Sequence, residues 1–492
     1  MFSKFSKKQF AIILVALCLC LTVVLGACNS ATAFKPIATE AGEVSGNGGI
    51  AVRYGNYIFY VNGYQSDATA ANDYVDSKRV GSIVRISVTD LEAAIEKTNQ
   101  SNKTSSVISS EIAKYVAEKA VVVVPNFYYS NNTTETGLNG IYIYNGRLYY
   151  TTPNDELTAD GAKLTSQLVL KSIDLANPEK VATRHFTFTD NTAQIILAEV
   201  DGKVVATYIM GGKLYTLDVA SGKNTEIKSK EIDEETKENK DLTVSNINYD
   251  RDSEGAYKGI FFTDADGSIC HIAVGAVDYQ VYVTNPKSDD DTTSSLTIKS
   301  VNDGYVYYTK TPADGTDYNV YFANGVVAEG KDSIFRTGGS SATIYGYGDK
   351  VIFLPSAKTV ADQTYYNIKV TDKDGNNEKL LLVPANNVYS IAITAVRGKY
   401  LYYTANSVSY KLDIDLACQT AQESGEVIAK SLSTTATGWS APDMLTFTIG
   451  ETNYNYVFTL ASGSVSVVKF DAATQKNTTA ATITLAEQTE EE

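Results

Sequence analysis

The chain has 492 residues and a formal net charge of −15, and it is rich in tyrosine (34) and glycine (34). Three lysines and no acidic residue lie in the first 27 positions, so the rest of the chain carries −18. An acidic surface of this size argues against a nucleic-acid partner, because phosphates bind to basic patches. The excess of strand-forming and turn-forming residues favours an all-β fold.

The N-terminus has the three parts of a secretory signal. A cluster of lysines precedes the apolar run Phe10–Leu25, and the small residues Gly26 and Ala27 follow it. The apolar run is shorter than the ~20 residues of a membrane-spanning helix. We therefore predict a signal peptide over residues 1–27 rather than a retained transmembrane helix.

The end of this segment, Leu25 to Cys28 (LGAC), resembles the lipobox of bacterial lipoproteins. The resemblance implies that the chain is cut before Cys28 and that lipid is attached to this cysteine. It further implies a protein at the bacterial cell membrane or surface, held there by its N-terminal lipid and facing outside the cytoplasm. Residues 28–46 are mostly small and polar, which predicts a flexible tether.

A repeated pattern fills residues 47–485. A glycine, an aliphatic residue, two aromatics and a threonine occur together in Gly146–Thr151 (GRLYYT) and in Gly304–Thr309 (GYVYYT). Each copy is followed by an apolar alternation that ends at an aspartate, as in VLKSID (169–174). Eight such units are centred on Arg85, Lys171, Thr216, His271, Tyr321, Lys369, Lys411 and Lys469. Their spacing of about 50 residues matches the blades of a β-propeller.

Each unit offers about four short strands that cannot bury both faces alone and must stack on neighbours. Tandem β-sandwiches need about 100 residues each and would not repeat one hairpin at this spacing. We predict an all-β fold, a β-propeller of about eight four-stranded blades. Seven blades is the alternative, since the last unit is the weakest.

Three segments depart from the repeat. Residues 90–120 space Leu91 and Ile112 with their neighbours as on helices, which predicts a helical insert. The charged stretch 228–241 has the composition of a solvated loop. The acidic tail, 486–492, is predicted to be disordered.

The Tyr-Tyr strands and the hairpins that follow them resemble a tyrosine-rich propeller repeat of uncharacterised bacterial lipoproteins and surface proteins. The resemblance covers most of residues 50–475. One unit, Gly212–Lys223 (GKLYTLDVASGK), is also similar to the quinoprotein propeller repeat, whose motif ends in tryptophan. Asn224–Glu226 supplies no tryptophan at that place, so no quinone and no other cofactor is expected.

Catalytic and metal-binding patterns are scarce. The two histidines, His185 and His271, lie about two blades apart, which does not suit a histidine metal site or a Ser-His-Asp triad. Cys270 and Cys418 lie three units apart and are predicted to be free and buried. Asp250–Gly255 begins like a calcium loop but lacks the glutamate that such a loop needs at its twelfth position. We interpret this segment and similar aspartate-rich stretches as hairpin turns, and assign no metal and no catalytic residue.

These observations favour a lipid-anchored propeller that acts as a binding or scaffold module. Its partner would be an extracytoplasmic protein, a glycan or an envelope polymer, since propellers present their loops to ligands. One alternative is a propeller-type glycoside hydrolase or lyase, because carboxylate pairs are spatial and leave no sequence spacing. Another is a structural subunit of an envelope assembly complex.

Overall fold

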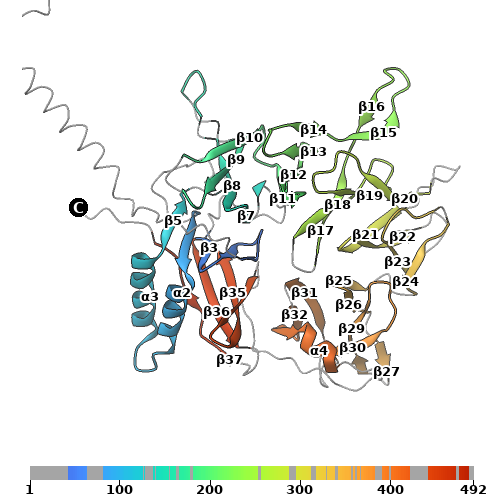
Figure 1. The fold of residues 1–492 in the computed structure, drawn as a ribbon. Coiled ribbons are helices and arrows are strands. Elements are labelled where there is room, and N and C mark those ends of the chain that lie inside the picture. The colour runs from blue at the N-terminus through green and yellow to red at the C-terminus, as the bar shows by residue number, and fades with distance from the viewer. Residues whose placement is uncertain are drawn as a thin grey trace, which may run out of the picture.

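Eight mostly antiparallel sheets follow one another around a ring, and each is one blade of a β-propeller (Figure 1). The fold is therefore all-β with eight mostly four-stranded blades, as predicted, and the alternative of seven blades was wrong. This computed structural model describes residues 43–486 except 64–80, 126, 128–136, 139, 155, 162–163, 165, 178–180, 253–255, 287–294, 312–316, 329, 338–341, 356–357, 361–362, 366, 383–389, 398–399, 421–441 and 472–475. The predicted signal peptide, Cys28 and the acidic tail after residue 486 lie outside these residues.

The first four blades occupy the N-terminal half of the ring. Blade 1 contains β1 (Val44–Ser45), β2 (Ala51–Tyr54), β3 (Tyr57–Val61), β4 (Ile83–Ser87) and β5 (Val121–Val124). Blade 2 contains β7 (Tyr142–Tyr144), β8 (Arg147–Pro153), β9 (Leu168–Asp174) and β10 (Thr183–Phe188). Blade 3 contains β6 (Gly137–Leu138), β11 (Gln194–Val200), β12 (Lys203–Met210), β13 (Lys213–Asp218) and β14 (Asn224–Glu226). Blade 4 contains β17 (Ser245–Arg251), β18 (Tyr257–Thr263), β19 (Ile269–Ala273) and β20 (Gln280–Val283).

The other four blades complete the ring. Blade 5 contains β21 (Ser295–Asn302), β22 (Tyr305–Thr311), β23 (Val320–Ala323) and β24 (Ser333–Arg336). Blade 6 contains β25 (Thr343–Tyr347), β26 (Lys350–Leu354), β29 (Ile368–Asp372) and β30 (Lys379–Leu382). Blade 7 contains β31 (Ile391–Arg397), β32 (Tyr400–Ala405) and β33 (Val408–Asp413), followed by helix α4 (Ile414–Thr420). Blade 8 contains β34 (Pro442–Ile449), β35 (Thr452–Ala461), β36 (Ser464–Asp471), β37 (Lys476–Asn477) and β38 (Ala481–Thr482).

Paired aromatic residues on the second strand of a blade hold neighbouring blades together. In β22, Tyr307 and Tyr308 are both fully buried, and successive residues of a strand point to opposite faces. Tyr308 packs with Phe261 of blade 4, whereas Tyr307 packs with Phe353 of blade 6. The repeated Tyr-Tyr pattern therefore supplies one aromatic ring to each of the two seams beside a blade.

The ring closes between blades 8 and 1. The hydroxyl of Tyr60 on β3 donates to the carbonyl oxygen of Ile483 at 2.9 Å. The buried amide of Asn62 donates to Leu485 O at 2.9 Å and accepts from Leu485 N at 2.8 Å. The first and last blades share one hydrophobic core, so the sheets form a closed ring and not an open array.

Helices cover this closing seam from outside. Helix α2 (Val88–Glu96), the 3₁₀ turn η2 (Lys97–Asn99) and helix α3 (Ser105–Lys119) form the predicted insert between β4 and β5. Helix α2 begins at a Ser87 cap and buries Leu91, and α3 buries Ile112. The two helices contact β36 and β38 of blade 8. Among the described residues, no helix is long and apolar enough to cross a membrane.

Two short hairpins stand outside the eight blades. Strands β15 (Lys228–Ile232) and β16 (Asn239–Asp241) pair with each other between blades 3 and 4, and Figure 1 shows them projecting from the ring. The segment 228–241 is mostly exposed, as predicted, but the prediction of a loop was wrong, because the segment forms a hairpin with cross-strand ion pairs. Strands β27 (Lys358–Val360) and β28 (Gln363–Tyr365) form the other hairpin, in the connection between β26 and β29 of blade 6.

Candidate functional site

The two faces of the propeller carry different connections between strands. Adjacent antiparallel strands turn at alternate ends, so the connections between first and second strands all lie on one face, which we call the turn face. The connections between third and fourth strands, among them the insert α2–η2–α3 of blade 1, also lie on this face. The opposite face, called the loop face, carries the connections between second and third strands and those between blades. Here the strands of a blade are counted outward from the inner strand of its four-stranded repeat, such as β2 or β11. The short strands β1 and β6 pair with the inner edges of β2 and β11 and are not counted.

Tight turns dominate the links between first and second strands. Two residues make the link in blades 1, 2, 3, 5, 6 and 8, namely Gly55–Asn56, Asn145–Gly146, Asp201–Gly202, Asp303–Gly304, Gly348–Asp349 and Gly450–Glu451. Asn145 and Gly146 have φ of 50° and 69°, as a type I′ turn requires. Such turns keep one end of the first hairpin of each blade short and regular.

The loop face carries long connections. Both extra hairpins, β15–β16 and β27–β28, lie in connections of this face. A third long connection joins β8 to β9, and the ion pair between Arg184 and Glu156 ties it to β10. Binding residues concentrate in loops held by a rigid scaffold, which makes the loop face the candidate binding surface.

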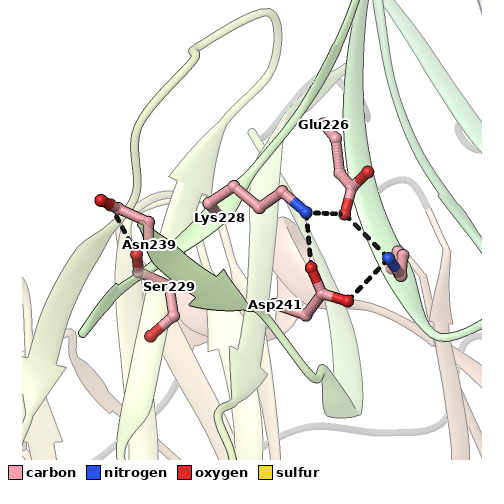
Figure 2. Close-up of polar contacts among 6 residues, drawn as sticks. Glu226, Lys228, Ser229, Asn239 and Asp241 are labelled. Carbon is pink, nitrogen blue, oxygen red and sulfur yellow. Dashed lines mark hydrogen bonds and ion pairs between the residues drawn. The ribbon is translucent and has the colours of Figure 1, made fainter. Parts of the chain in front are cut away.

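Four alternating charges fix the base of the β15–β16 hairpin. Lys228 Nζ lies 2.7 Å from Glu226 Oε1 and 2.5 Å from Asp241 Oδ1 (Figure 2). Lys213 of blade 3 binds the same two carboxylates at 3.1 and 2.9 Å. The two ammonium groups lower the pKa of Asp241 to about 2. An isolated hairpin is marginally stable in water, so this network orders the projection.

Further contacts orient the hairpin. The amide of Asn239 donates to Ser229 O across the strands at 2.8 Å (Figure 2). Lys230 N donates to the hydroxyl of Tyr279 on blade 4 at 3.3 Å, and its ammonium lies 5.2 Å from that ring. The hairpin is thus attached to both blades that it connects, while Ile232 near its tip is 60% exposed.

A buried acid–imidazole pair lies at the seam between blades 4 and 5. Asp250 on β17 is fully buried, and its Oδ2 lies 3.7 Å from His271 Nε2 on β19. Gly259 on β18 separates them, and a Cβ at this position would meet His271 Nε2 at 2.5 Å. The absence of a side chain at Gly259 therefore leaves the space in which the imidazole reaches toward the carboxylate.

Burial dominates the electrostatics of this pair. Asp250 Oδ2 accepts from Gly304 N of blade 5 at 2.8 Å, whereas Oδ1 has no hydrogen-bond partner among the described residues. Burial raises the pKa of Asp250 to about 6 and lowers the pKa of His271 to about 4. The carboxylate of Asp303 further raises the pKa of Asp250 and the ammonium of Lys373 lowers it, and these two groups form an ion pair at 3.0 Å. The pair can bind or release a proton, but the fully buried carboxylate is closed to a substrate.

The other histidine meets a serine. A β-bulge between Arg184 and Phe186 leaves His185 without a partner in the ladder. Its Nδ1 donates to Val219 O of blade 3 at 3.1 Å, so Nε2 accepts from Ser172 Oγ at 2.8 Å. Ser172 is fully buried, and its Oγ also accepts from Arg147 Nε at 3.0 Å. The distance between Ser172 and His185 resembles that between a serine nucleophile and its general base. However, the Ser172 hydroxyl is buried and makes two hydrogen bonds, and we therefore interpret the cluster as a structural link between blades 2 and 3.

The structure separates the other candidate residues. Cys270 and Cys418 lie on blades 4 and 7 as free thiols, and Cys418 is half-buried where full burial was predicted. The expected turn at Asp264 is present, since Oδ1 accepts from the backbone of Asp266 and Ser268. Among the described residues, no cluster of three or more His, Cys, Asp or Glu side chains could hold a metal ion. Asp250, interpreted from sequence as part of a turn, lies instead within β17, and sequence spacing gave no signal of its contact with His271.

Three comparisons relate the chain to known proteins. No family model matches the chain, and no curated protein matches it. A prolyl endopeptidase structure is similar with a TM-score of 0.39 and 14% identity, over 80% of this chain and 54% of that one. A post-proline cleaving enzyme from Rickettsia typhi gives 0.36 and 10%, over 78% and 57%. An oligogalacturonate lyase in complex with manganese gives 0.32 and 11%, over 64% and 89%. The chain spans about half the length of the prolyl endopeptidase, and likeness at this level carries no conclusion about activity.

Proposed function

We propose that this chain is a lipid-anchored, extracytoplasmic β-propeller that binds or scaffolds a protein, a glycan or an envelope polymer. The observation that carries the proposal is the loop face, where the connection between blades 3 and 4 forms the ordered β15–β16 hairpin. A closed ring whose first hairpins turn tightly provides a rigid base, and the projecting element provides the contact surface.

Anchoring is proposed through Cys28. Metabolic labelling with a fatty-acid analogue should label the wild-type protein and should fail for Cys28→Ala, which should leave the membrane fraction. The control is Cys418→Ser, which removes another thiol and should keep both the label and the location. Equal labelling of Cys28→Ala and wild type would overturn the lipid anchor.

Partner contact is proposed at the loop face. A photo-crosslinking residue at Ile232, which is 60% exposed, should form specific adducts in intact cells. The matched control is the same residue at the exposed Asp201 on the turn face, which should not form those adducts. Adducts that are the same from both positions would contradict a binding role for this face.

An enzyme is the second candidate, and the Ser172–His185 pair is the specific observation in its favour. A serine hydrolase would react with a fluorophosphonate probe at Ser172, and Ser172→Ala would abolish the reaction. The burial of Ser172 leads us to expect no labelling of the folded protein.

A further inference from the structure

The described chain begins on the inner side of the ring. Strand β1 pairs antiparallel with β2, on the edge of β2 that faces away from β3. Because β2 is the innermost blade strand and contacts β34 across the closing seam, β1 lies between β2 and the axis of the ring. The N-terminal segment therefore joins the propeller near its axis and not at its rim.

The direction of β1 shows from which face the chain arrives. Val44 pairs with Tyr54 at the end of β2, and Gly55 N donates to Glu43 O at 3.1 Å. Gly55 belongs to a two-residue turn of the turn face. Glu43 thus lies at the turn face, and the chain runs from there into the ring.

This entry point is fixed to the body of the propeller. Asn47 Nδ2 donates to Ile143 O at 3.2 Å, and Asn47 Oδ1 accepts from Ile143 N at 2.7 Å. Gly48 N donates to Ile141 O of blade 2 at 2.7 Å. Contacts with blades 1 and 2 hold the residues around β1 in place, so the position of Glu43 at the turn face is fixed.

We propose that the turn face is directed toward the lipid surface and that the loop face points away from it. This inference rests on the proposed lipidation of Cys28. The residues from Cys28 to Glu43 span at most about 50 Å when fully extended. To present the loop face to the membrane, this segment would have to pass around a blade, about 15 Å across four strands and about 30 Å along one strand. That path is almost as long as the fully extended segment, whereas no such detour is needed when the turn face is directed toward the membrane.

The attachment of the N-terminal segment at the turn face sets this orientation, and adsorption of the turn face to lipid headgroups does not. The turn face carries the exposed acidic residues Asp201 and Glu451, which anionic headgroups repel. Ligands on the side of the protein away from the lipid would then meet the loop face, which carries the connection that forms the β15–β16 hairpin. The orientation thereby places the proposed binding surface and the lipid on opposite sides of the ring.

The two ends of β35 provide matched probe positions. Glu451 and Ser462 flank this ten-residue strand and are both exposed. Dye-labelled Glu451→Cys and Ser462→Cys, each in a Cys418→Ser background, would be lipidated and placed in vesicles that contain an acceptor-labelled lipid. A second pair in blade 3, Lys203→Cys on the turn face and Thr192→Cys on the loop face, controls for tilt of the ring. Melting temperatures equal to that of the Cys418→Ser parent would show that each variant is folded.

Energy transfer to the lipid should be several-fold stronger from positions 451 and 203 than from 462 and 192. Vesicle-bound protein with equal transfer from the two faces, or stronger transfer from the loop face, would overturn the orientation while leaving the anchor intact. Wild-type protein that fails to float with vesicles, as Cys28→Ala is expected to fail, would overturn the anchor and with it the orientation.

Discussion

At the scale of single residues, the seams between blades hold polar groups whose partners come from the next blade. Asp250 of blade 4 accepts from Gly304 of blade 5 and lies beside His271, with an unpaired Oδ1. A buried carboxylate without full hydrogen bonding is destabilised in its charged form. The seam between blades 4 and 5 should therefore respond to pH.

The sign of this response follows from the direction of the two shifts. The pKa of Asp250 is about 6 in the folded chain and about 3.9 when unfolded, so its contribution to stability is present below pH ~4 and is lost as pH rises through about 6. We expect the free energy of unfolding of Asp250→Asn, relative to that of wild type, to be about 2 kcal/mol higher at pH 8 than at pH 4.5. Urea denaturation at the two pH values measures the difference.

His271→Gln provides a control of opposite sign. The pKa of His271 is lowered to about 4, so its contribution is present above pH ~6.5 and is lost as pH falls through about 4. The free energy of unfolding of this variant, relative to that of wild type, should therefore decrease as pH rises. A pH-independent difference for both variants would refute the account of the seam.

At the scale of elements, the helical insert is attached to the last blade by a buried ion pair. Glu92 of α2 pairs with Lys469 of β36, and their side chains are only 13% and 16% exposed. The ammonium of Lys469 lies 3.9 Å from the Tyr454 ring. The pair links an element near the start of the ring to one near its end.

Lys469→Met should be strongly destabilising because it leaves Glu92 buried without its partner, at a cost of about 3–5 kcal/mol. The double variant Glu92→Leu with Lys469→Met should recover much of that loss, since no charge then remains buried. Chemical denaturation of the two single variants and the double variant tests this as a cycle. Additive losses would show that the two side chains do not depend on each other.

At the scale of the whole molecule, closure of the ring makes the eight blades one cooperative unit. Every blade has two neighbours, and the closing seam depends on Tyr60 and Asn62 contacting residues near the other end of the chain. Asn62 is fully buried and binds both the amide and the carbonyl groups of Leu485. Loss of this contact leaves backbone groups unsatisfied inside the protein.

Asn62→Ala should therefore lower the free energy of unfolding by about 2–4 kcal/mol, within a single unfolding transition. Asn324→Ala is the matched control, because the Asn324 amide donates to Tyr305 at an exposed site and its loss should have little effect. Calorimetry and circular dichroism monitor both variants. A first transition confined to blades 8 and 1, followed by a separate melt of the others, would argue against a cooperative ring.

The sequence by itself determined the architecture, and only the tertiary structure decided which residues meet across seams. All eight residues used to centre the repeat, from Arg85 to Lys469, lie in third strands, because alternation of apolar and polar side chains is a local property of a pleated strand. The hairpin over 228–241 was missed because its order comes from ion pairs with Lys213 of blade 3 and not from apolar alternation. The Asp250–His271 contact and the course of β1 along the axis have no local signal either. They depend on how the blades stack and in which direction the chain enters a closed ring, and both are fixed only when distant strands come together.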